Sequence, residues 1–360
     1  MIDHLKKFDW IMVSVALLLS LIGLVFIYGI SVSSGDFSNF YKQISFLFIG
    51  VILMILVSLI DWRSLRENPY LILLGYFVSL FLLAGLFVFA PEIRGVAGWY
   101  RIGPISFDPI GLSTLTLALL LAKFFSMRHI EMYKLRHIIL SGLYVLVPFA
   151  LIAGQPDLGS ALILLALWGS ILIVSGIKIR HFVALVLVAA IVFCGSWFLV
   201  LKDYQKNRIA SFLTPEAEVL GVNWSQAQSK IAIGSGGFWG KGFLEGSQTH
   251  LGFLSEPHTD FIFSVIGEEF GFFGALVVIA LFGVLFWRLL AISLSSKYNF
   301  PRLFAFGFLT IIFSQFFIHV SMNLGLLPVI GLSLPFVSYG GSGLISFFIG
   351  IGFLQGIKIH

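Results

Sequence analysis

Two aspartates beside long apolar segments could act as general bases in a group-transfer reaction. Asp260 immediately precedes one apolar run, and Asp157 lies between two others, where a neighbouring proline and glycine indicate a tight turn. A carboxylate at the mouth of a membrane span can take a proton from a substrate when partial burial raises its pKa. The alternative for each aspartate is that it only caps the N-terminus of a helix.

Two glutamates follow Asp260 on the same predicted helix. Glu268 and Glu269 lie about 12 Å deeper than Asp260, at about 1.5 Å per residue. Acids at that depth usually face a polar cavity or a partner, so we favour an ion-pair or hydrogen-bond role for both. Glycines on the helical face of Asp260 would let another helix approach closely. The residues that share this face are Ser264, Gly267 and Gly271.

Basic residues in the polar segments could bind phosphate. Segment 234–242 resembles a phosphate-binding loop but is not a Walker A motif, because Ser235 and Gly242 stand where that motif needs Gly and Ser or Thr. Its backbone amides could still hold a phosphate, although we interpret it as a flexible loop. The basic residues of these segments that could meet a phosphate are Arg101, Arg208, Lys230 and Lys241.

Two further groups have more than one interpretation. Trp99, next to the predicted fourth span, is best explained as an interfacial anchor, but it could stack on a sugar while Arg101 meets a phosphate. Glu256, His258 and Asp260 could hold a divalent cation such as Mg²⁺ or Mn²⁺, yet their spacing supports this only weakly. We therefore predict no fixed metal site, with a divalent cation as a possible cofactor.

The composition requires that most of the chain lies in lipid. Of 360 residues, 59% are hydrophobic and 11% are charged, whereas a soluble domain usually has about a quarter charged residues. The net charge of +5 comes without a basic, aromatic-rich stretch, so we expect no nucleic-acid partner. The single cysteine, Cys194, excludes an intrachain disulfide.

The apolar runs predict an all-α integral membrane protein with about ten transmembrane helices and no separate soluble domain. A span needs about 20 mostly apolar residues, and backbone in lipid must satisfy its own hydrogen bonds. The predicted spans are 9–30, 41–60, 70–90, 108–125, 137–153, 158–176, 181–201, 260–289, 303–323 and 339–357. Segment 202–259 is the one large polar loop, between the seventh and eighth spans.

The basic residues predict that both termini are cytoplasmic and that segment 202–259 is extracellular. The short loops opposite the termini hold only Lys42, Arg94 and Arg101, and cytoplasmic loops carry the excess of Lys and Arg. The basic residues on the side of the termini are Lys6, Lys7, Arg63, Arg66, Lys123, Arg128, Lys134, Arg136, Lys178, Arg180, Arg288, Lys297, Arg302 and Lys358.

Together these segments resemble the SEDS family of bacterial membrane proteins, and its RodA branch more than its FtsW branch. The matching stretches are 155–160, 228–237, 240–242, 257–265 and 331–342. They follow the family order along nearly the whole chain. The resemblance implies a ten-helix bundle with a large extracellular loop, in the bacterial cytoplasmic (inner) membrane.

The resemblance also implies an activity and a partner. Family members are peptidoglycan glycosyltransferases that polymerise lipid II at the outer membrane face during cell elongation and cell-shape maintenance, working with a class B penicillin-binding protein. By the family pattern, Asp260 matches the essential outer-loop aspartate and Asp157 a second aspartate near the central cavity. The alternatives are a lipid-linked precursor flippase and a weakly active scaffold for the penicillin-binding protein.

The sequence departs from the family pattern at the start of the fourth span. Gly111 and Thr114 stand where the family usually has a glutamate and a lysine. Losing both together avoids leaving one buried charge unpaired, but it puts full activity in doubt. Asp108, about one turn away, is the residue that could substitute for the missing acid.

Overall fold

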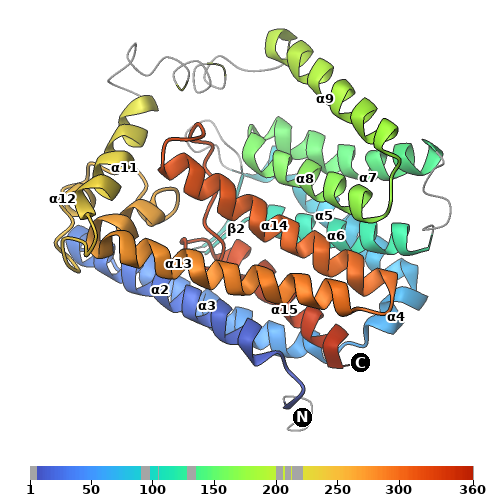
Figure 1. The fold of residues 1–360 in the computed structure, drawn as a ribbon, viewed down its shortest axis with the longest axis horizontal. Coiled ribbons are helices and arrows are strands. Elements are labelled where there is room, and N and C mark those ends of the chain that lie inside the picture. The colour runs from blue at the N-terminus through green and yellow to red at the C-terminus, as the bar shows by residue number, and fades with distance from the viewer. Residues whose placement is uncertain are drawn as a thin grey trace.

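A computed structural model describes residues 6–90, 98–103, 105–127, 135–199, 206, 212 and 222–359. Ten apolar helices dominate these residues (Figure 1). They are α2 (Trp10–Ser34), α3 (Ser38–Ser58), α5 (Pro69–Phe89), α6 (Ile110–Ser126), α7 (Leu135–Gly154), α8 (Leu158–Val174), α9 (Ile179–Leu199), α13 (Ile262–Ser295), α14 (Asn299–Asn323) and α15 (Gly341–Ile359).

Each of these helices overlaps one predicted span, which confirms the predicted fold class. Eight are long and apolar enough to cross a membrane, whereas α6 and α8 are shorter apolar helices of 17 residues. A helix of that length extends for about 25 Å. A hydrocarbon core is about 30 Å thick, so each of these two helices is slightly shorter than that thickness.

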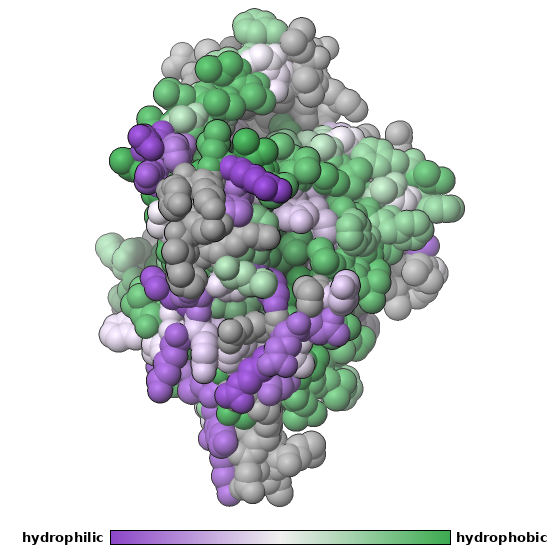
Figure 2. Space-filling model, turned by 90° about the vertical axis from the view of Figure 1, so that its right-hand side faces the viewer, coloured by the Kyte–Doolittle hydropathy of each residue, from purple (hydrophilic) through white to green (hydrophobic). Residues whose placement is uncertain are grey.

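Both termini lie at the same end of the bundle, as an even number of spans requires (Figure 1). Asp9 caps α2, is held by Arg288 of α13, and accepts a bond from Lys358 of α15 at 3.2 Å. The Gln355 side chain accepts from the Asp9 amide through Oε1 and donates to the Asp9 carbonyl through Nε2. Figure 2 views the molecule from this end and shows hydrophilic residues across its middle, flanked by hydrophobic ones.

Glycines let the helices and loops approach closely in the bundle core. A Cβ at Gly23 of α2 would lie 2.1 Å from the carbonyl oxygen of Val337, and one at Gly352 of α15 would lie 2.4 Å from that of Met54. Only glycine fits at such positions, because the neighbouring atoms are main chain and cannot rotate away. The same device joins α11 (Val222–Gly236) to α13, where a Cβ at Gly236 would lie 1.9 Å from the Gly267 oxygen.

Short elements lie between the spans. They are α4 (Trp62–Glu67), α11, α12 (Ser247–His250) and an antiparallel hairpin of β1 (Tyr100–Ile102) and β2 (Ile105–Phe107). Helices α11 and α12 lie at the end of the molecule away from the termini (Figure 1). The interpretation of 234–242 as a flexible loop is wrong, because residues 234–236 belong to α11 and four of the next six residues bond to the main chain of α13.

Helix α13 is broken at Gly271, whose φ of 63° and ψ of −155° are not helical. The break leaves main-chain groups without helical partners, and the loop after α11 supplies them. The amides of Phe272 and Phe273 donate to the carbonyls of Gly237 and Phe238 at 2.8 and 3.2 Å. Non-helical backbone at membrane depth is stable only with such partners, so this loop and the first part of α13 form one unit.

Candidate active site

Asp260 lies just before α13 and does not cap it. The residue at the N-cap is Phe261, which makes no side-chain capping bond. Instead Asn323, the last residue of α14, accepts a bond from the Ser264 amide at 3.2 Å. The interpretation of Asp260 as a helix cap is therefore wrong, because a distant helix supplies that bond.

The main chain around Asp260 is held by the C-terminal part of the protein. Three consecutive carbonyl oxygens accept bonds from donors that lie more than 60 residues further along the chain. The pairs are His258 with the Tyr339 amide at 2.9 Å, Thr259 with the Ser338 hydroxyl at 2.7 Å, and Asp260 with the Asn323 side-chain amide at 2.9 Å. The main chain of Asp260 is thus held in place by hydrogen bonds, although the residue lies in the loop before α13.

Segment 330–332 lies between Asp260 and the N-terminus of α8. A Cβ at Gly331 would lie 3.7 Å from Oδ2 of Asp260. On the other side, a Cβ at Gly159 of α8 would lie 2.9 Å from Leu332 and 3.2 Å from the Ile330 oxygen. The same segment therefore contacts Asp260 and the helix that begins beside Asp157.

Asp157 is the N-cap of α8. Its carboxylate accepts bonds from the amide and hydroxyl of Ser160 at 2.9 and 2.6 Å. These two bonds fix the carboxylate at the N-terminus of α8, where the helix stabilises negative charge. The capping interpretation is confirmed for Asp157, and its role in substrate binding stays a prediction.

Asp108 lies two residues before α6 and close enough to Asp157 to sense its charge. The Ser342 hydroxyl bonds its amide at 2.9 Å, and one carboxylate oxygen accepts from the Ile110 amide at 2.8 Å. Burial raises the pKa of Asp108 to about 7, and the negative charge of Asp157 adds to the rise, while the Ile110 bond opposes it. Asp108 is therefore an acid that can gain or lose a proton near neutral pH.

The surroundings of Gly111 and Thr114 are tightly packed. A Cβ at Gly111 would lie 2.8 Å from the Ser346 hydroxyl, so Ser346 occupies the space that a larger residue would need. Thr114 is buried, and its hydroxyl bonds the Ile110 carbonyl one turn earlier at 2.9 Å. No charge is left unpaired at these two positions.

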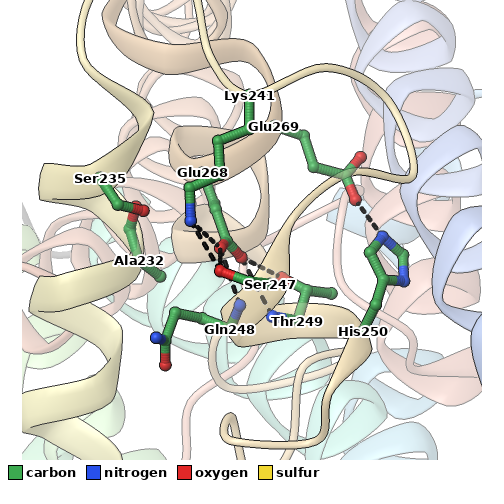
Figure 3. A network of polar contacts seen from close by, with 9 residues as sticks. All are labelled: Ala232, Ser235, Lys241, Ser247, Gln248, Thr249, His250, Glu268 and Glu269. Atoms are coloured by element: carbon green, nitrogen blue, oxygen red, sulfur yellow. Dashed lines mark hydrogen bonds and ion pairs between the residues drawn. The ribbon is translucent and has the colours of Figure 1, made fainter.

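Glu268 holds α12 and Lys241 in place (Figure 3). Its carboxylate is 0% exposed and pairs with Lys241 at 2.9 Å. It also accepts bonds from the Gln248 amide at 2.8 Å and from the amide and hydroxyl of Thr249 at 3.0 and 2.8 Å. Glu268 therefore has the ion-pair role that its position favoured, and Lys241, a predicted phosphate ligand, is already paired.

Glu269 has a separate partner in His250, with Nε2 and Oε1 at 2.8 Å (Figure 3). This contact ties the end of α12 to α13, as the ion-pair interpretation of Glu269 expected. The amides of Lys241 and Gly242 donate to the carbonyls of Glu268 and Glu269. These two amides are therefore not available to hold a phosphate. The suggestion that backbone amides of segment 234–242 bind phosphate does not hold for them.

The other predicted ligands are more open. Lys230 is exposed on α11 and its stem lies against Gly325, while Arg101 is exposed on β1. Trp99 precedes β1 and is 39% exposed. Burial lowers the pKa of His258, opposed by the charges of Glu256 and Asp36. Arg208, another predicted cation, lies outside the described residues.

The described part of the chain contains no group of three or more His, Cys, Asp or Glu side chains placed to hold a metal ion. Glu256, His258 and Asp260 are all within that part and do not form such a group, and a divalent cation as cofactor stays a prediction. We assign no step of the chemistry to a protein-bound metal.

Comparison with known proteins decides the family. The FtsW/RodA/SpoVE family model, described as "Cell cycle protein", matches residues 9–360. The chain belongs to this family. Its sequence is 38% identical to peptidoglycan glycosyltransferase MrdB of Escherichia coli strain K12, over 92% of this chain and 88% of that one. It is 34% identical to stage V sporulation protein E of Bacillus subtilis, over 97% and 96% of the two chains.

Solved structures agree with this family. The fold matches the rod shape determining protein RodA of Thermus thermophilus with a TM-score of 0.72 and 30% identity, over 98% of this chain and 96% of that one. It also matches a chain from a peptidoglycan synthase complex that coordinates polymerization and crosslinking, with a TM-score of 0.82, 30% identity and coverage of 98% and 97%. The predicted SEDS resemblance is confirmed.

Sequence reasoning missed the residues that support Asp260. Asn323 and Ser338 were not singled out, although Asn323 is a polar residue at the end of an apolar span, where an unsatisfied amide would be costly. Their importance depends on which groups they bond, and these are more than 60 residues away in sequence.

Proposed function

We propose that this chain is a peptidoglycan glycosyltransferase that polymerises lipid II at the outer face of the bacterial cytoplasmic membrane. The observation that carries the proposal is the mounting of Asp260, whose support comes from three bonds to the C-terminal segment and whose carboxylate is not used to cap α13. A carboxylate whose main chain is held in this way, in a connection at the mouth of a span, is suited to proton transfer.

In the proposed reaction, Asp260 is the general base. A sugar hydroxyl of the acceptor loses its proton to the Asp260 carboxylate as its oxygen bonds to the anomeric carbon of the donor. The bond from that carbon to the lipid pyrophosphate breaks, and the pyrophosphate leaves with the electron pair, so the configuration inverts. Lys230 and Arg101, both exposed, are the cations proposed to meet the leaving charge.

The location and partner are part of the same proposal. Both termini would be cytoplasmic, which puts α11, α12 and Asp260 on the outer side, as the distribution of Lys and Arg favours. The likeness to a chain of a peptidoglycan synthase complex supports assembly with a class B penicillin-binding protein, which would supply crosslinking. Work during cell elongation is supported by the likeness to a rod shape determining protein.

The test is polymerisation of labelled lipid II by purified protein, with and without the penicillin-binding protein, read as glycan length on gels. Asp260→Asn should slow polymerisation by about 10²-fold or more, because it removes the base. Its thermal unfolding midpoint should change little, because asparagine keeps the shape of the side chain and Asp260 is not the N-cap of α13. Glu245→Gln, at an exposed acid of the same outer segment, is the matched control and should keep the parental rate.

The outcomes separate the alternatives. Parental polymerisation by Asp260→Asn would eliminate Asp260 as the base and make Asp157 the next candidate. A parental protein that moves lipid II between membrane leaflets but forms no polymer would indicate a flippase. A parental protein that binds the penicillin-binding protein but forms no polymer with or without it would indicate a scaffold.

A further inference from the structure

A buried amide at the end of α14 lies directly behind Asp260. The Asn323 side chain is 0% exposed, and its Nδ2 donates to the Asp260 carbonyl at 2.9 Å. We infer that Asn323 is a positioning residue, which fixes the Asp260 carboxylate by holding the Asp260 main chain. The inference rests on the proposed function and names a residue on which the rate of that reaction would depend.

The orientation of the amide is determined by its partners. Oδ1 accepts from the amide and hydroxyl of Ser264, and Nδ2 donates to the carbonyls of Asp260 and His319. A flipped amide would place a donor against the Ser264 amide and an acceptor against two carbonyls. Because both ends of the side chain are satisfied in only one orientation, the bond to Asp260 is built into the fold.

The same residue joins three elements around the proposed base. Its own carbonyl accepts from the Ser229 hydroxyl of α11 at 2.7 Å, and Ser264 belongs to the first turn of α13. Asn323 therefore fixes α11, α13 and the connection that carries Asp260 relative to one another. A main chain that is held in this way limits the positions that the short side chain of Asp260 can reach.

Small displacements of a base have large effects on rate. A misplacement of about 1 Å can cost about 10²-fold in a reaction that depends on alignment. A change at Asn323 that lets the Asp260 main chain move should therefore reduce kcat, while the surfaces that bind the lipid-linked sugars stay in place. A residue that only stabilised the bundle would not produce this separation of kcat from KM.

The chain offers a matched control in Gln226. This buried amide of α11 donates to the carbonyls of Met322 and Leu327 at 3.2 and 2.7 Å. It holds the same end of α14 but has no recorded bond to residues 258–260. Gln226→Leu and Asn323→Leu thus remove comparable buried amides, and only the second removes the bond to Asp260.

The experiment compares these variants in the full chain. Asn323→Leu should lower kcat for lipid II polymerisation by about 10²-fold, with KM within about threefold of the parent. Gln226→Leu should keep kcat within about threefold even where it lowers the unfolding midpoint as much. In an Asp260→Asn background, Asn323→Leu should have almost no further effect, because the group that it positions is gone. If Asn323→Leu does not fold, Asn323→Asp replaces the donating nitrogen with an oxygen and should give the same pattern.

Hydrogen exchange provides a readout that does not depend on activity. Amides 258–264 should exchange faster in Asn323→Leu and at the parental rate in Gln226→Leu. Parental kcat in the Asn323 variants, an equal loss in the Gln226 variant, or full additivity with Asp260→Asn would overturn the inference. A parental protein that makes no polymer would refute the proposed function, and exchange at 258–264 would still decide whether Asn323 holds Asp260.

Discussion

Replacing Lys241 with methionine should loosen α12, and the effect should depend on the charge of Glu268. Lys241→Met keeps most of the length of the side chain but leaves the Glu268 carboxylate, which is 0% exposed, without its counter-ion. Breaking a buried pair from one side costs about 3–5 kcal/mol. Since Lys241 is 28% exposed, we expect the lower limit, about 3 kcal/mol for opening of the segment.

The Glu268→Gln background provides the internal reference. There the Lys241 replacement leaves no buried charge unpaired, so its further cost should be about 1 kcal/mol, the value of an ordinary hydrogen bond. The coupling between the two changes should therefore be about 2 kcal/mol, within the range measured for residues in one network. The Lys241 replacement should cost more in the parental background, because Glu268 is the buried partner and its unpaired charge cannot reach water.

Hydrogen exchange of peptides covering 243–254, measured in nanodiscs, reports this opening. Two of the amides concerned, Gln248 and Thr249, donate to Glu268. A change of about 3 kcal/mol should accelerate their exchange by about 10²-fold, and about 1 kcal/mol by about fivefold. Equal acceleration by Lys241→Met in the parental and the Glu268→Gln backgrounds would refute the reasoning.

Three further predictions concern charge and topology. Because the pKa of Asp108 is raised to about 7, the folded state keeps this carboxyl protonated at pH values where it is ionised in the unfolded chain. The parental unfolding midpoint should thus fall relative to Asp108→Asn as pH rises from about 4 to 7 and then level off; a constant difference would contradict this. The double change Gly111→Glu with Thr114→Lys should raise polymerisation only when Ser346→Gly makes room, and either change alone should destabilise; equal activity in all variants would show that the pair is dispensable. After removal of the native cysteine, Glu245→Cys should react with a membrane-impermeant thiol reagent in intact cells, whereas labelling only after lysis would reverse the proposed orientation.

Local rules were sufficient for much of the fold. The hydrophobic runs predicted the ten apolar helices of the described residues to within a few residues at most ends, because a helix in lipid is specified largely by its apolar length. The cost of buried acids correctly predicted that Glu268 and Glu269 have partners. The prediction for segment 234–242 was wrong. Its glycines resemble a flexible loop in sequence, but in the structure they allow close packing against α13.

The sequence by itself determined the class of protein, the spans and the acids that could do chemistry. Only the tertiary structure decided what each acid is free to do. Asp260 and Asp157 looked alike as possible helix caps, but Asp157 caps α8 whereas Asn323 supplies the bond at α13. The physical reason is that hydrogen-bond partners from distant segments compete with local ones, and their positions depend on the packing of the whole bundle. The spacing of residues along the sequence does not show which of these partners forms the bond.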